Sequence, residues 1–535
     1  MEEDKVNKAE EWVDNYNKLM ESPNGLGVSG ALQSMVLAIE APYLEVQQQA
    51  APLCTQCGDG DRRPGFPGER QVNSPNQDID NAPNITQSET SIARSGSNIL
   101  FGYNDSNRAR FGNFSGFAFS SNNGVTWNDC GSMPLNPGWT NGGDPVIAAD
   151  SRGVFYYSHL GSTNTGQSVI QVNTATVNPG LRTLCMNNSF VAGVGGVTNG
   201  FQDKEWMAVG RDSTGGFNAE AIYLTWTEFP PGAGNVAIRF AKWTTGETPT
   251  VLIASKNLVT GAALQNSFPV IDSRGNIFVF YEDFNGSYIG VTREIRMVKS
   301  TDGGINFSTP ITVSEVVRAS TDVLTCGVFL RPVIRVTDNK VIRNQEAPHA
   351  AIGPDGTLYV VWNDGRNLAT TGIDIYLAYS RDGGNTWTVR QVTNSATHQF
   401  MPSVIANCSG AHIQYSSFDG VSGVGNGRFA LFMKSFSVNR GVSSETRVST
   451  VFSLVPDNRP TNFDDRVATC YMGDYNQIIT GPGLSLYHSW GDNRNDPNNG
   501  NNPDVFFIQT GNPLWIRTIL LCLLAFVLRV LQSVV

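Results

Sequence analysis

Short hydrophobic runs separated by turn residues recur along the middle of this 535-residue chain. The repeating pattern is an apolar strand, a turn with glycine, a second strand that ends in an aromatic residue, and a loop rich in Asp and Asn. The segments 269–283 (PVIDSRGNIFVFYED) and 348–364 (PHAAIGPDGTLYVVWND) show it most clearly. The runs are short, rich in β-branched and aromatic residues, and bounded by Gly, Pro and Asn, so they predict strands.

Seven copies of this pattern occur, and they begin near residues 91, 145, 206, 269, 348, 402 and 475. A third strand follows each copy, and the best copies have a fourth, such as 389–393 (VRQVT). Four antiparallel strands per unit, repeated radially, is how β-propellers remove exposed sheet edges. We therefore predict an all-β fold, a β-propeller of four-stranded antiparallel blades. Seven blades are favoured, and six are possible if the second and third copies merge.

The last copy has no obvious fourth strand of its own. Residues 69–73 (ERQVN) near the other end of the repeat region are similar to the fourth strand at 389–393. We therefore predict that this N-terminal strand completes the last blade and closes the ring.

The two ends differ from the repeat region, which we place at residues 68–512. Residues 1–21 carry apolar side chains at a spacing of three to four, which predicts a short amphipathic helix, and a linker then extends to residue 67. Residues 513–535 form a hydrophobic tail, predicted as an apolar helix, with an uninterrupted apolar run at 519–528. Ten apolar residues are half of the ~20 that span a bilayer. The segment 515–535 is therefore a C-terminal membrane anchor, a helix docked on the domain, or a segment without a structural role.

Composition narrows the function classes. Hydrophobic residues make up 40% of the chain and charged residues 16%, so a packed core is expected. The net charge of −10 argues against a nucleic-acid partner, because binding phosphates needs a basic surface.

The N-terminus lacks the basic and apolar regions of a signal peptide. No cofactor motif is present; the carboxylate-rich loops could bind calcium, although no EF-hand loop occurs. Cys54 and Cys57 form a lone CxxC, which favours a local disulfide or two free thiols over zinc.

Three further segments align between predicted third and fourth strands: 120–127 (SSNNGVTW), 300–307 (STDGGINF) and 380–387 (SRDGGNTW). In each, the Asp or Asn side chain can accept protons from turn amides, glycine can take a positive φ, and the aromatic residue can pack into the blade. These segments resemble the Asp-box (BNR) repeat of the sialidase (neuraminidase) superfamily, and the resemblance covers roughly residues 68–512.

The resemblance implies a sialidase-like glycoside hydrolase acting on terminal acidic sugars of extracellular glycans. The alternative is a non-catalytic Asp-box propeller that binds a glycan or a protein partner. In both cases the implied partner is a glycan or glycoprotein. The implied location is extracellular or on the cell surface, with the C-terminal tail as a candidate membrane anchor.

Strands alternate in direction within a blade, so the loops after the second strands share one face with the links between blades, and a binding site is expected there. Sialidases bind a sugar carboxylate with three arginines and use a Tyr nucleophile assisted by Glu, with an Asp acid/base. By this resemblance Arg108, Arg366 and Arg494 bind the substrate. Asp105 is the acid/base, Tyr471 the nucleophile, and Glu205 or Glu346 its base. The competing interpretation is that the repeated Asn-Asp-x-Arg-Asn loops are turn chemistry and surface ion pairs inherited by duplication.

Overall fold

A computed structural model describes residues 18–19, 68–78, 85–197, 200–327, 329–420, 427–455, 457, 464–495 and 503–511. Strands dominate this part of the chain, so the all-β prediction is confirmed. The N-terminal helix, the linker with its CxxC motif and the C-terminal tail lie outside the described residues, apart from Lys18 and Leu19, which are helical. Within the described ranges, no helix has the length and hydropathy needed to cross a membrane.

The strands pair antiparallel into eight sheets, seven of which have four or more strands. The first sheet contains β2 (Gln87–Ser95), β3 (Asn98–Asp105), β4 (Ser115–Ser120) and β5 (Asn128–Ser132). The second contains β6 (Thr140–Ala149), β7 (Phe155–Ser162), β8 (Ser168–Asn178), β9 (Thr183–Met186) and β10 (Phe190–Val194). The third contains β11 (Phe201–Arg211), β12 (Glu220–Phe229), β13 (Val236–Thr244) and β14 (Val251–Gly261). The fourth contains β15 (Leu264–Ile271), β16 (Ile277–Asp283), β17 (Thr292–Ser300) and β18 (Ile311–Val317).

A smaller three-stranded sheet follows, with β19 (Asp322–Cys326), β20 (Phe329–Thr337) and β21 (Lys340–Arg343). The next large sheet contains β22 (His349–Ile352), β23 (Leu358–Asp364), β24 (Asp374–Ser380) and β25 (Thr388–Gln391). After it come β26 (Gln399–Asn407), β27 (Gly410–Phe418), β28 (Arg428–Ser437), β29 (Gly441–Val442), β30 (Thr446–Arg447) and β31 (Ser453–Leu454). The last sheet combines β32 (Gln477–Thr480), β33 (Leu486–Asp492), β34 (Asp504–Thr510) and β1 (Glu69–Gln71). The described residues also form three short 3-10 helices: η2 (Pro75–Gln77), η4 (Ser106–Phe111) and η5 (Pro482–Leu484).

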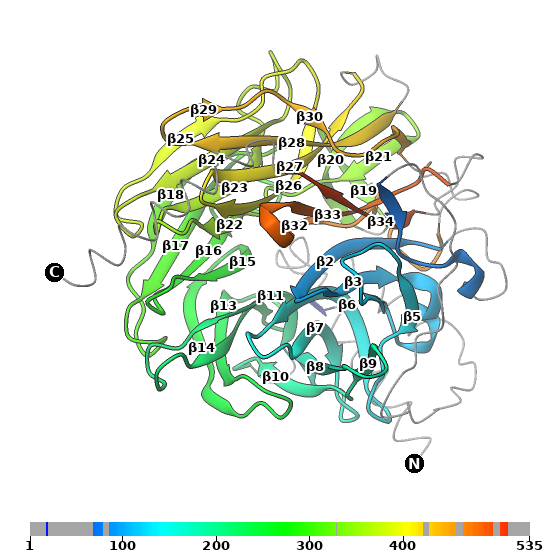
Figure 1. Ribbon diagram of the computed structural model, residues 1–535. Helices are drawn as coiled ribbons and strands as arrows, with labels where there is room; N and C mark the ends of the chain where they lie inside the picture. Colours follow the sequence, from blue (N-terminus) through cyan, green and yellow to red (C-terminus); the bar gives the residue numbers. More distant parts are fainter. Residues whose placement is uncertain are drawn as a thin grey trace.

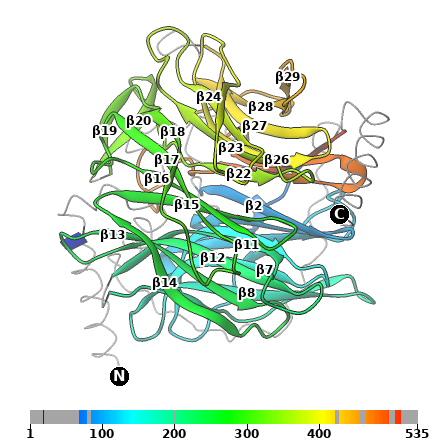
Figure 2. The same ribbon diagram turned by 90° about the vertical axis from the view of Figure 1, so that its left-hand side faces the viewer.

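The seven large sheets form a closed ring. Their first strands contact one another in the order β2, β6, β11, β15, β22, β26 and β32, and β32 contacts β2 again. Figure 1 shows these strands around the middle of the molecule, with the later strands of each sheet further out. Figure 2 shows the sheets that begin with β11, β15 and β22 stacked one above the other. The predicted arrangement of four-stranded antiparallel sheets is thus observed.

The N-terminal strand closes this ring. Residues of β1 pair with β34, with Glu69 opposite Ile508 and Gln71 opposite Phe506. The side chain of Arg494 forms an ion pair with Glu69 at 3.0 Å across the closure. The prediction that segment 69–73 completes the last sheet is therefore confirmed for residues 69–71.

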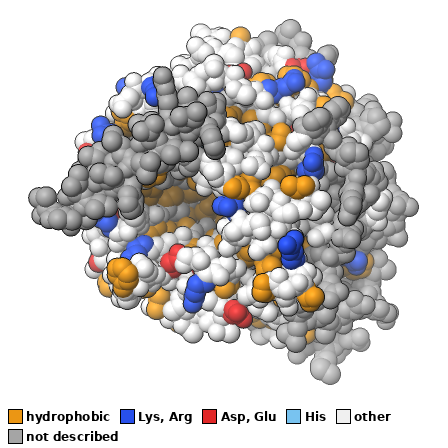
Figure 3. Space-filling view, viewed as in Figure 1, with side chains coloured by type: hydrophobic (Ala, Val, Ile, Leu, Met, Phe, Trp, Pro, Cys, Tyr) orange, Lys and Arg blue, Asp and Glu red, His pale blue; other side chains and the backbone are white. Residues whose placement is uncertain are grey.

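The core consists of layers between neighbouring sheets. In β3, Phe101 belongs to the layer shared with the last sheet, whereas the adjacent Leu100 belongs to the layer shared with the second sheet. Successive side chains of a strand point to opposite faces, so a strand covered on both faces buries both sets. Figure 3 shows a further group of hydrophobic side chains in a surface hollow near β13 and β15.

The three Ser-x-Asp/Asn-x-Gly turns have the same hydrogen bonds. In each, the serine hydroxyl accepts from the glycine N–H at 2.9 Å, and that glycine has a positive φ. The side-chain Oδ1 of the Asp or Asn accepts from the backbone N–H four residues on, at 2.9–3.0 Å. The following aromatic residue contacts a ring of the preceding sheet, in the pairs Trp127–Phe507, Phe307–Phe240 and Trp387–Phe280. These turns therefore position an aromatic wedge between consecutive sheets.

Candidate active site at the ring axis

The first strands of five sheets share one irregularity. The pairing skips two residues in β2, β6, β11, β15 and β26. The first skipped residue has a positive φ in every case, and these residues are Glu89, Asp144, Lys204, Asn266 and Met401. A positive φ at a non-glycine residue costs on the order of 1–3 kcal/mol, and such strain concentrates at functional sites. The repeated bulge therefore marks one level of the ring axis as a candidate site.

Three of these bulges bring charged side chains together. We define the axial cluster as the buried residues Glu89, Asn104, Asp144, Lys204, Glu205, Arg343, Tyr471 and Asp474, none of which is more than 9% exposed. Its members come from β2, β3, β6, β11, β21 and the link that precedes β32. The cluster thus depends on closure of the whole ring.

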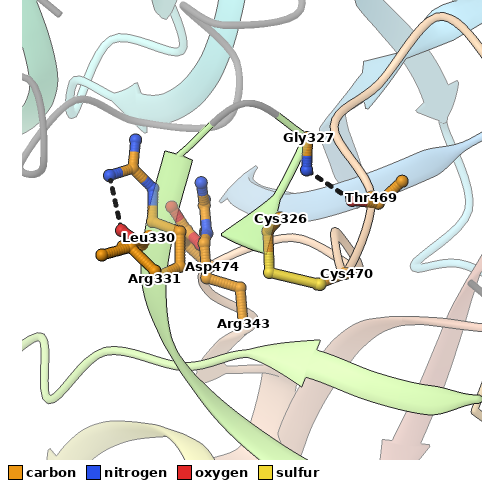
Figure 4. The surroundings of a disulfide bond; sticks show 8 residues. All are labelled: Cys326, Gly327, Leu330, Arg331, Arg343, Thr469, Cys470 and Asp474. Carbon is orange, nitrogen blue, oxygen red and sulfur yellow. Dashed lines mark hydrogen bonds and ion pairs between the residues drawn. A yellow bond between two sulfur atoms is a disulfide. The ribbon is translucent and has the colours of Figure 1, made fainter. Parts of the chain in front are cut away.

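Asp474 is the anion that holds the two cations. Its Oδ2 lies 3.0 Å from Lys204 Nζ, and its Oδ1 lies 3.0 Å from Arg343 Nε (Figure 4 shows the Arg343 side). Burial alone would raise the pKa of Asp474, but Arg343 and then Lys204 outweigh burial and hold it well below the usual range. The backbone N–H of Asp474 donates to Glu89 Oε1 at 3.0 Å. Asp474 is therefore ionised and saturated with donors.

Tyr471 and Glu89 share a donor. Asn104 Nδ2 lies 2.7 Å from the Tyr471 hydroxyl oxygen and 2.9 Å from Glu89 Oε2. The Arg343 guanidinium lies 5.3 Å from the centre of the Tyr471 ring. Burial, and then the charges of Glu89 and Asp474, raise the pKa of Tyr471 well above its usual value. The phenol is neutral at pH 7, and its proton could leave only if a neighbouring base accepted it.

The charges of Glu89 and Asp144, besides that of Asp474, act on this phenol, and Glu205 in turn acts on Asp144. Burial raises the pKa of Glu89, and raises the pKa values of Asp144 and Glu205 well above the usual range. The carboxyl groups of Glu89 and Asp144 interact directly, so a proton on one can bond to the other. Such a pair titrates as a unit, and burial favours the form in which it retains a proton.

Four aromatic rings pack together beside the cluster, and we call them the aromatic plug: Trp206, Phe268, His349 and Tyr475. Trp206 stacks on Phe268 at 4.4 Å between ring centres, and lies 4.9 Å from His349 and 5.3 Å from Tyr475. Burial, and then Lys204, lowers the pKa of His349 to about 3, so this imidazole is neutral. On β11 and β15 the plug residues Trp206 and Phe268 directly follow the bulge. The charged cluster is therefore on the link side of the plug, which is the face where the sequence predicts a site.

Glu346 belongs to a different buried group. It pairs with Arg293, which also bonds Glu282 at 3.1 Å, and all three side chains are at most 1% exposed. Burial, and then the charge of Glu346, raises the pKa of Glu282 to about 8. Among the hydrogen bonds and ion pairs of the described residues, none connects Glu346 with Tyr471.

Asp105 and two of the predicted arginines lie in loops that share one turn, in which an Asp side chain accepts from the backbone N–H two residues on. Asp364 Oδ2 accepts from the Trp362 indole at 2.9 Å, and its Oδ1 accepts from the backbone N–H of Arg366 at 2.9 Å. The same bonds occur at 2.8 and 3.1 Å among the corresponding residues Trp490, Asp492 and Arg494. In the first sheet, Asp105 Oδ1 accepts from the backbone N–H two residues on at 3.1 Å, and burial raises its pKa to about 7. The recurrence of these residues follows from a repeated turn.

The three arginines have separate surroundings. Arg366 pairs with Asp364 and lies over the Tyr376 ring, whereas Arg494 pairs with Asp492 and Glu69. Arg108 is exposed on η4. Among the described residues, Arg366 and Arg494 share no hydrogen-bond or ion-pair partner. Their role in substrate binding stays a prediction.

Among the predicted site residues, the structure places Tyr471 in the axial cluster and Glu205 close to Asp144 of that cluster, and leaves Asp105 and Glu346 elsewhere. Sequence reasoning missed Glu89, Lys204 and Arg343. A signal for the first two exists, because in three copies a charged residue (Glu89, Asp144 or Lys204) stands three positions before the buried Ile or Met of the first strand. Arg343 carries no such signal, since it lies outside the repeats.

In the part of the chain that the structure describes, no group of three or more His, Cys, Asp or Glu side chains is arranged to hold a metal ion. The cysteines of this part are disulfide-bonded, and Cys326 is joined to Cys470.

Known protein families and curated proteins provide no match to this sequence. Solved structures with similar folds include an α-L-arabinofuranosidase of Fusarium graminearum, with a TM-score of 0.43 and 10% identity over 83% of this chain and 97% of the other. An α-L-arabinanase of Penicillium chrysogenum gives 0.42 and 12% over 83% and 98%. A sialidase of Trypanosoma rangeli gives 0.35 and 10% over 65% and 54%. Similarity at this level does not decide what this chain does.

Proposed function

We propose that this chain is a glycoside hydrolase whose chemistry takes place at the axial cluster, and that the seven large sheets are the blades of a seven-bladed Asp-box propeller. The observation that carries the proposal is a neutral phenol, Tyr471, beside the carboxyl groups of Glu89 and Asp144, whose pKa values burial raises, with Glu205 close to Asp144. Glycosidases need one group that donates a proton and another that attacks or activates water, and environments that separate their pKa values supply both.

The roles follow from the contacts. Tyr471 is the nucleophile, and the Glu89–Asp144 pair accepts its proton, because Asn104 bonds both the phenol oxygen and Glu89. Glu205 donates a proton to the leaving oxygen, because burial keeps its carboxyl group protonated. Asp474 is unsuited to attack, since Lys204 and Arg343 occupy its two oxygens.

The ion pairs of the cluster favour a neutral sugar. Lys204 and Arg343 both bind the ionised Asp474. A sugar carboxylate would have to compete with this buried carboxylate for the two cations. The acidic sugar that the family resemblance implies would instead require Arg108, Arg366 and Arg494 to reach one ligand.

The disulfide-bonded cysteines support an oxidising, extracellular or cell-surface location. This location fits a glycan or glycoprotein partner. Association with a membrane through residues 515–535 stays a prediction.

The test is hydrolysis of a panel of fluorogenic glycosides that contains arabinofuranosides, hexosides and a sialoside. Tyr471→Phe and Glu205→Gln should each lower kcat/KM by ~10²-fold or more. The control is Glu247→Gln, the same chemical change at an exposed position. Thermal unfolding of every variant separates lost chemistry from lost folding. If the unaltered protein binds glycans and cleaves none of the panel, the non-catalytic alternative replaces this proposal.

A further inference from the structure

The three-stranded sheet β19–β21 stands apart from the repeat. It lies in the chain between the fourth large sheet and the one that begins with β22, and its strands pair only among themselves within the described residues. The disulfide Cys326–Cys470 joins the end of β19 to the link that carries Tyr471 and Asp474 (Figure 4). The backbone of the same link is also bonded to β21, because the Arg343 N–H donates to the Cys470 carbonyl oxygen at 2.8 Å.

Arg343 is the last residue of β21, and its side chain is 3% exposed. Its guanidinium donates from Nε and Nη2 to Asp474 Oδ1 and stands 5.3 Å from the centre of the Tyr471 ring. Figure 4 shows Arg343 and Asp474 beside the disulfide. One side chain therefore contacts both functional residues of the link.

We propose that Arg343 is a positioning residue of the axial site, delivered by the β19–β21 sheet and fixed by the Cys326–Cys470 disulfide, and that it sets the charge balance at which the site works. The proposal rests on the function proposed above. Arg343 acts through Asp474, Glu89 and Tyr471, and it contacts no reacting atom itself.

The electrostatic argument is specific to the groups around Asp474. Lys204 faces it from β11, Glu89 from β2 and Arg343 from β21, with Tyr471 on the same link. Asp144 on β6 acts on Glu89 and Lys204. Arg343 supplies one of only two cations in this set, and it lowers the pKa values of both Asp474 and Glu89. Its loss would shift Asp474 and Glu89 toward the protonated form, so that Glu89 could accept the Tyr471 proton only at higher pH.

The measurement is the pH dependence of kcat/KM for the oxidised full chain. Arg343→Met should move the acid-side apparent pKa upward by ~1 unit or more, a tenfold change at a fixed pH on that limb. Arg343→Lys should give an intermediate shift, because a single ammonium cannot reproduce the two-point contact of the guanidinium. Arg335→Met is the matched control, since Arg335 lies on the same small sheet with a 34% exposed side chain, and its profile should be unchanged. An unshifted profile in Arg343→Met overturns the proposal.

The disulfide is tested by Cys326→Ser with Cys470→Ser, which should shift the profile in the same direction. A folded double variant with the profile of the unaltered protein would refute the positioning role of the disulfide.

A second readout does not need activity. Infrared pH-difference spectra report carboxyl protonation, and the signal that is absent in Asp474→Asn belongs to Asp474. This signal should titrate at higher pH in Arg343→Met than in Arg335→Met. If no glycoside is cleaved but this shift occurs, the proposed function fails and the positioning role of Arg343 stands. If the signal does not shift, the positioning role fails.

Discussion

Substituting Arg494 distinguishes a structural role of this side chain from a role in substrate binding, because Arg366 provides a matched comparison. Arg494 and Arg366 occupy equivalent loop positions, and each pairs with the Asp two residues earlier. The Arg494 side chain is 9% exposed and also pairs with Glu69 of the closing strand, whereas the Arg366 side chain is 32% exposed. Substituting each by Ala removes the same group from two environments.

The expected magnitudes follow from burial. Arg494→Ala leaves the buried carboxylates of Glu69 and Asp492 without their cation and removes the guanidinium from the Phe506 ring, 4.1 Å away. Breaking a buried pair by removing one partner costs ~3–5 kcal/mol. Arg366→Ala should cost about 1 kcal/mol, because the Arg366 guanidinium is partly exposed to solvent and Asp364 keeps its bonds from the Trp362 indole and the backbone N–H of residue 366. The difference of at least ~2 kcal/mol corresponds to roughly a 30-fold change in the folding equilibrium.

Urea unfolding followed by tryptophan fluorescence measures both free energies with the same protein preparation. Equal losses in Arg494→Ala and Arg366→Ala would refute the reasoning from burial. A substrate-binding role makes a different prediction: both variants would raise KM for a sialoside, with small and similar losses of stability.

Three further predictions concern the ring and its buried groups. Trp127→Ala removes a wedge that contacts Phe507, and should lower the free energy of unfolding by ~3–5 kcal/mol, measured against Val125→Ala at an exposed position. Asp302→Ala removes the acceptor of a turn and should cost ~1 kcal/mol. Backbone N–H donation from Asn306 is the main cause that lowers the pKa of Asp302 from 3.8 to about 2, so this contribution should be present above pH 3.8 and lost as the pH falls toward 2. Burial, and then His412, lowers the pKa of His488 from 6.5 to about 3. Between these two pH values the unfolded chain binds a proton at His488 that the folded chain does not bind. Stability should therefore fall below pH 6.5 by up to ~1.4 kcal/mol per pH unit for this residue, and His488→Gln should remove that part of the slope if the reasoning holds.

Local signals predicted the strands and turns well. The alternation in segments such as 269–283 and the glycines at the turns determine strands that pair with their neighbours, so they can be seen in one sequence. The similarity of residues 69–71 to a fourth strand also predicted the ring closure, because a missing strand leaves a recognisable gap in a repeat.

The site was less predictable because it depends on contacts between distant segments. The bulges at Glu89, Asp144 and Lys204 arise from pairing with the second strands, and a hydrophobic pattern does not contain that register. Arg343 reaches Asp474 from an irregular insertion, 131 residues away in sequence. In contrast, the recurring loops predicted site roles for Asp105, Arg366 and Arg494. The recurrence of these residues comes from the geometry of a turn.

The closing strand also sets the order of events during synthesis. Asn73, just after β1, donates to Asp504 from 431 residues earlier in the chain. At a translation rate of roughly 5–20 residues per second, the first strand waits on the order of 20–90 s for its partner to leave the ribosome. During that interval the nascent chain carries an open sheet edge at each end of an incomplete ring, and capture by a chaperone or by another unfinished chain competes with closure.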